Sequence, residues 1–287
     1  MKLTDCVEVD DFFIIQDTIP VMSKTIGVRV YDFNFRHYFP TQSLLSPPAK
    51  MVVARMGAFP DYSVVYDSLL TAGIQLVHTL EQYQRCSLLP HWYPLLLDLT
   101  PKSKVYESFP TVKDIENEFS WPVFVKGERQ TSRHKKSLSI IESAAAFEDL
   151  RIHWKHNTML HWQKLVCREY IPLQLIEPSS GDRLPSSYEF RLFYWRQHLV
   201  SIGRYWYEAR PYSLSRQEQT QVEALGNEVA KRLSVCFLAV DIAKTVAGEW
   251  IVIEVNDGQE SGYAANNPRL MWEKIIAIEK LEDSGML

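Results

Sequence analysis

The pattern of apolar and polar positions in the first hundred residues predicts short strands and helices. Val65, Leu69 and Leu70 recur at helical spacing, and Gly73 ends that helix. Apolar runs precede and follow this helix, and a strand–helix–strand unit of this kind favours a parallel sheet. Strands are predicted over 11–16, 25–33, 51–56 and 74–77, and a proline-interrupted helix over 79–99.

Thr100-Pro101 reads as a boundary between lobes, and after it the strands predicted over 104–108 and 121–127 carry β-branched and aromatic residues bounded by Pro and Gly. The segment 188–208 predicts a hairpin that turns at Arg196-Gln197 or at 196–198, and Ser215 with Glu218 predicts a capped helix over 215–234. Further strands are predicted over 137–141, 165–171, 237–242 and 249–256, with helices over 143–156 and at the C-terminus. The fold class is therefore α/β, with antiparallel strands late in the chain.

The last two predicted strands carry three oxygen-bearing side chains in apolar surroundings. If their hairpin is centred between Ala247 and Gly248, Asp241 lies opposite Glu254, and Asn256 shares the face of Glu254. Two buried carboxylates repel each other unless a cation lies between them, and hard oxygen ligands suit Mg²⁺. The spacing alone predicts a metal site and a solvated polar face equally well.

Basic side chains also occur on apolar strands. Lys126 ends one such strand and can reach a phosphate, although a lone lysine more often extends to solvent. On another strand, alternation places Glu189 and Arg191 on one face, as an exposed ion pair or as the lining of a nucleotide site. Arg204, on the returning strand, is a second candidate.

Composition narrows the class of protein. The chain has 287 residues, a net charge of −4, 46% hydrophobic and 23% charged residues, which is ordinary globular usage. The acidic balance argues against a dedicated nucleic-acid binder. No apolar run is long enough for a membrane span, and the N-terminus does not have the pattern of a secretory signal. The cysteines show no C-x-x-C pair, so a cytoplasmic location is expected.

Four motifs give the chain a family resemblance. VFVKG, LVCREYIP, YEFRLF and VDIAKT…GEWIVIEVNDG together resemble the ATP-grasp carboxylate–amine ligases over roughly residues 100–262. Within that superfamily, the chain looks like a clade of predicted peptide ligases marked by conserved arginines and a lysine. The resemblance implies two α+β lobes that grip ATP, over 101–170 and 171–287, after an N-terminal α/β domain over 1–100.

The same resemblance implies roles in nucleotide binding. Lys126 is expected to hold the α- and β-phosphates, and Glu189 to face the ribose. Backbone groups at Glu169, Tyr170 and Ile171, in the hinge between the lobes, are expected to read the adenine edge.

It also implies the groups for phosphoryl transfer. Arg191, with Arg204, is expected to stabilise the γ-phosphoryl group and an acyl phosphate, and Asp241, Glu254 and Asn256 to bind Mg²⁺. One departure is the loop after Lys126, ERQTSRHKK, which carries hydroxyl and basic residues instead of the family's glycines.

The predicted reaction joins a small-molecule or peptide carboxylate to an amine at the expense of ATP. The loop 257–263, directly after the metal-binding strand, is expected to contribute to the acceptor site. The alternatives are a phosphotransferase on the same fold and a nucleotide-binding protein without activity. The identity of both substrates stays open, as does the oligomeric state, for which the resemblance suggests a homodimer.

Overall fold

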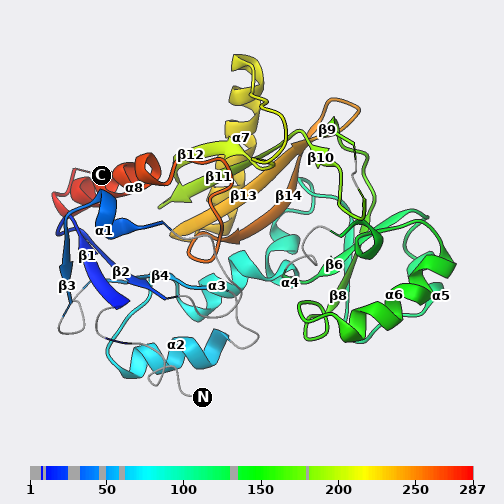
Figure 1. The fold of residues 1–287 in the computed structure, drawn as a ribbon, viewed down its shortest axis with the longest axis horizontal. Coiled ribbons are helices and arrows are strands. Elements are labelled where there is room, and N and C mark those ends of the chain that lie inside the picture. Colours follow the sequence, from blue (N-terminus) through cyan, green and yellow to red (C-terminus); the bar gives the residue numbers. More distant parts are fainter. Residues whose placement is uncertain are drawn as a thin grey trace.

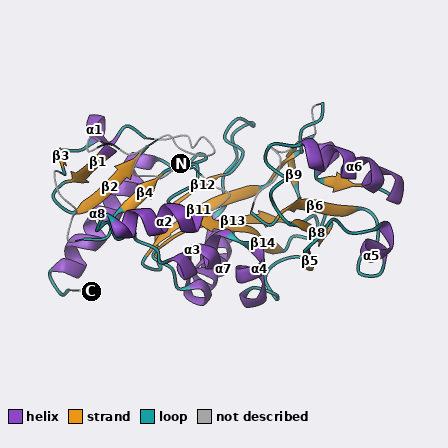
Figure 2. Cartoon of the chain, turned by 90° about the horizontal axis from the view of Figure 1, so that it is seen from below, coloured by secondary structure: helices purple, strands orange, loops and turns teal. Residues whose placement is uncertain are grey.

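Three bodies follow one another along the long axis of the molecule (Figures 1 and 2). An N-terminal sheet lies at one end beside the C-terminal helix, a large sheet forms the middle, and a smaller lobe forms the other end. The structure is a computed structural model, and it describes residues 8, 11–24, 33–44, 50–57, 62–129, 135–178 and 181–286. Its mixed α/β architecture agrees with the predicted fold class.

The N-terminal sheet has the strand order β3-β1-β2-β4, with β2 and β4 parallel. A parallel bridge from Val52 to Leu76 follows helix α2, as the strand–helix–strand prediction requires, although 74–77 forms no full strand. Strand β2 is not among the predicted strands, and it includes Pro20, a residue that is rare inside a sheet. The predicted strand 25–33 falls mostly outside the described residues. The elements are β1 (Phe12–Ile15), β2 (Ile19–Ser23), α1 (Phe35–Tyr38), β3 (Thr41–Ser43), β4 (Val53–Arg55) and α2 (Tyr62–Thr71).

The helical connection breaks at its prolines. Thr79 and Gln82 form a capping box at the start of α3, and Pro90 and Pro94 each lie in the first turn of a new short helix. The elements are α3 (Leu80–Ser87), α4 (Leu89–Trp92) and the 3₁₀ helix η3 (Tyr93–Leu95).

The small lobe is an antiparallel sheet with the order β5-β8-β6-β7, whose apolar face packs on α6. The predicted strand 137–141 is wrong in its first half, since Lys136–Leu138 forms a 3₁₀ helix. The elements are β5 (Ser103–Tyr106), α5 (Val112–Glu116), β6 (Val123–Gly127), η4 (Lys136–Leu138), β7 (Ile140–Ile141), α6 (Ala144–His156) and β8 (Leu165–Glu169). The unpredicted pair β9 (Leu175–Glu177) and β10 (Ser186–Ser187) follows.

The large lobe is built on the sheet β12-β11-β13-β14. Its hairpin turns at Arg196-Gln197, the shorter of the two predicted turns, and both residues have positive φ angles, of 46° and 67°. The capping box of Ser215 and Glu218 begins α7. The elements are β11 (Glu189–Trp195), β12 (His198–Arg204), α7 (Arg216–Leu233), β13 (Phe237–Lys244), β14 (Trp250–Asp257) and α8 (Pro268–Asp283).

Alternation along β11 divides the large sheet into two faces. Leu192 and Tyr194 pack with α7 on one face. On the other face, Phe193 and Trp195 pack against α8 and the N-terminal sheet. Towards the small lobe the same face becomes polar, and neither α8 nor the N-terminal sheet covers it there. Among the described helices, none combines the length and apolarity that crossing a bilayer requires.

Candidate functional site

A cleft of about 620 Å³ lies between the small lobe and the polar part of the large sheet. Its size is typical of a ligand site. Strands β6 and β8 contribute one wall, β11 and β14 contribute the other, and the residues after β8 and β14 close its two ends.

Three charged residues lie side by side on the face of the large sheet that borders the cleft, and we call this row, Arg191, Asp241 and Glu254, the charged floor. Arg191 of β11 pairs with Asp241 of β13, which in turn pairs with Glu254 of β14. Asn256 also lines the cleft, two residues beyond Glu254. The predicted juxtaposition of Asp241 and Glu254 is therefore observed.

This pairing arises differently from the prediction. The observed turn is one residue tighter than assumed, since Lys244 pairs with Trp250. A bulge at Ile253 then shifts the register by one residue and brings Glu254 opposite Asp241.

Ion pairs neutralise both carboxylates. The guanidinium of Arg191 donates from Nε and Nη2 to the two oxygens of Asp241, each at 2.7 Å. The ammonium of Lys126, from β6 across the cleft, contacts Glu254. Burial lowers the pKa of Lys126 well below its usual value, and the nearby Arg168 lowers it further.

The oxygen-bearing side chains of the cleft are of the chemical type that binds magnesium. Carboxylate and amide oxygens are the ligands that Mg²⁺ prefers, and Glu254 and Asn256 face the cleft. Asp241, with 1% of its side chain exposed, lies against the guanidinium of Arg191. A cation at this site therefore competes with Lys126 and Arg191 for the carboxylates.

Arg168 lines the cleft, although no role was predicted for it. It lies on β8 diagonally from Lys126, because Phe124 pairs with Arg168 and Lys126 with Val166. Its Nε donates to Ser103 and its Nη1 to the carbonyl of the bulged Ile253. Its Nη2 is buried without a hydrogen-bond partner among the described residues. Two buried cations side by side favour an anionic ligand. In the sequence, the feature that could have indicated this role is an arginine within the largely apolar strand LVCREYI.

The opposite end of the cleft is apolar and includes the predicted hinge. Glu169, Tyr170 and Ile171 all line it. The backbone N–H of Glu169 donates to the carbonyl of Lys102 at 2.8 Å, so this amide already has a partner. Apolar side chains complete this end, among them Phe124, Ile140, Leu173, Ile251 and Ile253.

Glu189 lies in the cleft on the face that it shares with Arg191, as predicted. Its Oε2 accepts hydrogen bonds from Ser187 Oγ at 2.8 Å and from Trp206 Nε1 at 3.1 Å. Burial raises the pKa of Glu189 to about 8, and repulsion from Asp241 adds to this shift.

Arg204 does not reach the cleft in this structure. A two-residue turn with an unbroken ladder would place Arg204 opposite Glu189, on the face of Arg191. A bulge at Val200 shifts the register by one residue, so Arg204 pairs with Phe190 and joins the opposite face. Residues 130–134 of the basic loop after Lys126 lie outside the described residues.

Buried polar contacts hold the loop after β14. Arg55, from the N-terminal sheet, donates to the carbonyls of Gly258 at 2.9 Å, Gln259 at 2.6 Å and Ser261 at 3.2 Å. The carbonyl of Gly262 accepts from Arg191 Nη1 at 2.8 Å. The loop is therefore fixed on one side by the N-terminal domain and on the other by the charged floor.

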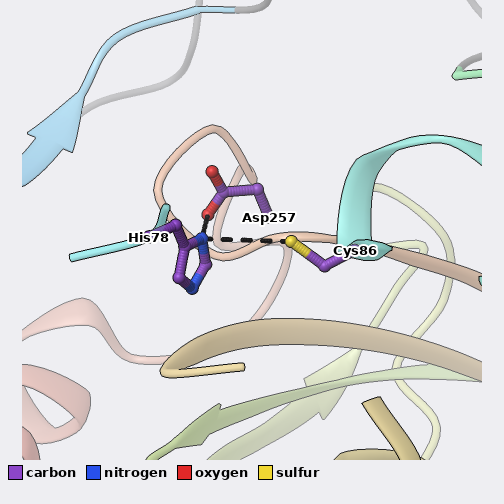
Figure 3. Close-up of side chains that lie close together, drawn as sticks. All are labelled: His78, Cys86 and Asp257. Atoms are coloured by element: carbon purple, nitrogen blue, oxygen red, sulfur yellow. Dashed lines mark hydrogen bonds and ion pairs between the residues drawn. The ribbon is translucent and has the colours of Figure 1, made fainter. Parts of the chain in front are cut away.

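His78, Cys86 and Asp257 meet at the end of β14, where this loop begins (Figure 3). The backbone N–H of Phe237 donates to His78 Nε2, so Nδ1 carries the proton and points at Asp257 Oδ1, 3.2 Å away. Burial raises the pKa of the Cys86 thiol. A protonated Nδ1 and a thiol are poor metal ligands. The cluster instead orients Asp257, whose carboxylate accepts from the backbone and side-chain amides of Gln259.

Comparisons with known proteins place this geometry in a family. The family model described as the ATP-grasp domain of R2K clade family 3 matches residues 105–275, more than half of the chain. A search of the curated proteins gave no match.

Solved structures share the fold at low sequence identity. A RimK domain ATP-grasp protein from Sphaerobacter thermophilus is 16% identical, with a TM-score of 0.55 over 83% of each chain. VanG D-Ala:D-Ser ligase from Enterococcus faecalis is 16% identical, with a TM-score of 0.57 over 80% of this chain and 72% of that one. D-alanine–D-alanine ligase from Bacillus anthracis, solved with ATP, is 15% identical, with a TM-score of 0.53 over 80% of both chains. The protein therefore belongs to family 3 of the R2K clade of ATP-grasp domains.

Proposed function

We propose that this protein is an ATP-dependent ligase that joins a carboxylate to an amine. The carboxylate oxygen attacks the γ-phosphorus of ATP, the bond to the β,γ-bridging oxygen breaks, and ADP leaves. The amine nitrogen then attacks the acyl carbon, phosphate leaves with the electron pair of the C–O bond, and the nitrogen loses a proton. The products are an amide, ADP and phosphate.

The cleft has the polarity that ATP requires. Its apolar end by the hinge suits the adenine, and in this proposal Tyr170 and Ile171, which line that end, read the base edge. Glu189, which also lines the cleft, accepts hydrogen bonds from the ribose hydroxyls in this proposal. At the other end, Lys126 and Arg168 present two buried cations to the phosphates.

Arg191 stabilises the phosphoryl group during transfer in this proposal. Its Nε and Nη2 are held by Asp241 and its Nη1 by the carbonyl of Gly262. A guanidinium fixed in this way loses little freedom when a phosphate reaches it, which is the condition for effective electrostatic catalysis. Asp241, Glu254 and Asn256 would hold Mg²⁺, which neutralises phosphate charge when bound.

The observation that carries this proposal is the pair of buried cations, Lys126 and Arg168, facing the oxygen-bearing residues Glu254 and Asn256 across one cleft. Lys126 is already paired with Glu254, but Arg168 has only neutral partners and its Nη2 makes no hydrogen bond among the described residues. A buried charge without a counter-ion costs free energy, so packing alone does not account for this arrangement. Mg²⁺ with a triphosphate supplies both signs of charge at once.

The test is to incubate the protein with Mg-ATP and paired carboxylates and amines, and to measure ADP and product masses. A product whose mass equals both substrates minus water supports the ligase. A stable phosphorylated compound would instead indicate a phosphotransferase. Glu254→Gln should abolish ADP formation, while Glu107→Gln, at a side chain that is 81% exposed, should not change it.

A further inference from the structure

A second charged pair lies in the cleft and has no part in the nucleotide chemistry above. Arg129 follows β6 in the small lobe, and Glu260 lies in the loop after β14. The two side chains form an ion pair across the cleft, and 6% and 9% of them, respectively, are exposed. Both residues line the cleft.

Neighbouring groups orient this pair. Arg129 Nη2 also contacts the hydroxyl of Tyr83, whose oxygen lies 3.4 Å from Glu260 Oε1. Burial raises the pKa of Glu260, whereas the charge of Arg129 lowers it. The loop of Glu260 is the one that Arg55 holds.

The pair lies at the phosphoryl end of the cleft. Gly262, two residues after Glu260, accepts the hydrogen bond from Arg191, which is assigned to the transferred phosphoryl group. Arg129 lies three residues after Lys126, at the end of the same cleft wall. An acceptor molecule must approach the acyl phosphate at this end.

A third group faces the same cleft. Ser87, at the end of α3, is 4% exposed and lines the cleft, and its Oγ makes no hydrogen bond within the described part of the chain. A buried hydroxyl without a partner is costly, and a polar ligand atom in the cleft would satisfy it.

We propose that Glu260 and Arg129 bind the amine substrate, and that this substrate is a free α-amino acid. The inference rests on the proposed ligase function. The ammonium group of the amino acid pairs with Glu260, and its carboxylate pairs with Arg129. Before its nitrogen attacks the acyl carbon, the ammonium gives one proton to the adjacent Glu260 carboxylate.

Charge balance selects this class of ligand. Without a substrate, the two side chains neutralise each other in a site with little water. A simple amine would pair with Glu260 and leave the guanidinium uncompensated, and a simple carboxylate would do the reverse. A zwitterion with adjacent charges inserts between them and leaves every charge paired.

The experiment measures amino-acid binding directly. The full chain, saturated with Mg²⁺ and a non-hydrolysable ATP analogue, is titrated calorimetrically with each of the protein amino acids. The tightest ligand is then compared with its methyl ester and its N-acetyl derivative. Each derivative should bind at least about 30-fold more weakly, as expected when a buried charge loses its partner.

Variants assign the two contacts. Glu260→Gln should weaken amino-acid binding at least about 30-fold and leave the affinity for the ATP analogue unchanged. The double variant Glu260→Gln/Arg129→Gln leaves no unpaired charge, so it should be less destabilised than either single variant. It should also lose the selectivity over the ester. Glu107→Gln is the control.

Two results would overturn the inference. One is that no amino acid binds at millimolar concentration, and the other is that Glu260→Gln binds as tightly as the parent. The proposed ligase function fails separately, if the protein does not bind the ATP analogue with Mg²⁺ or forms no ADP with any carboxylate and amine.

Discussion

Replacing Arg191 with methionine should destabilise the fold, because it leaves the buried Asp241 carboxylate without its partner. The substitution leaves the Asp241 carboxylate 1% exposed, without the two 2.7 Å hydrogen bonds that now neutralise it. Removing one partner of such a pair typically costs about 3–5 kcal/mol. For a chain of this size, each kcal/mol lowers the Tm by roughly 2–4 °C, so the Tm should fall by about 6–20 °C.

A double-mutant cycle in urea separates the charge from the loss of packing. Arg191→Met/Asp241→Leu removes both charges, and it should recover most of the free energy of unfolding that the single variant loses. The matched control is Arg269→Met on α8, where the side chain is 59% exposed and a change of less than about 0.5 kcal/mol is expected. A loss of under about 1 kcal/mol in Arg191→Met would refute the reasoning, because it would mean that water reaches Asp241.

Three further predictions concern the groups around the floor. The pKa of Glu189 is raised to about 8, so its protonated form stabilises the fold in acid, and that stability is lost as the pH rises through 8. Glu189→Gln should therefore flatten the pH dependence of the urea midpoint between the pKa of the glutamate in the unfolded chain and pH 8. Arg168→Lys keeps the charge but loses the fork of donors, and it should raise the Kd for ATP about tenfold in calorimetric titration; an unchanged Kd would remove Arg168 from the phosphate site. His78→Ala should lower the free energy of unfolding by about 2–4 kcal/mol, because Phe237 N–H and Asp257 lose their partner; a Tm of the parent protein that rises with added zinc would contradict this structural role.

Local patterns predicted the elements of the site well. Alternation along β11 correctly placed Glu189 and Arg191 on one face, and the capping box of Ser215 and Glu218 correctly began α7. Both predictions depend only on the spacing of residues within one strand or one helical turn, and this spacing can be read from the sequence.

Contacts between distant strands could not be predicted in this way. Arg168 and Lys126 share a face because β6 and β8 are neighbours, although α6 separates them in the chain. Arg129 and Glu260 meet across the two lobes. Periodicity gives the face of a residue within its strand, but it does not give the order of the strands in the sheet.

Two bulges decide which charges reach the cleft, and neither has a clear sequence signal. The bulge at Val200 turns Arg204 away from the face of Arg191, and the bulge at Ile253 aligns Glu254 with Asp241. The second also leaves the carbonyl of Ile253 to accept from Arg168 of the other lobe. One extra residue in a strand therefore both sets the floor and joins the lobes.

The ion pairs across the cleft help to explain how ligands can enter. Lys126 with Glu254, and Arg129 with Glu260, each join the small lobe to the large one. When the lobes separate, all four charges regain water, and this hydration offsets most of the attraction lost. Opening is therefore much less costly than the attraction of two buried pairs suggests. A ligand that carries charges of both signs neutralises these four side chains when the cleft closes around it. The same residues therefore favour a closed cleft when it holds such a ligand.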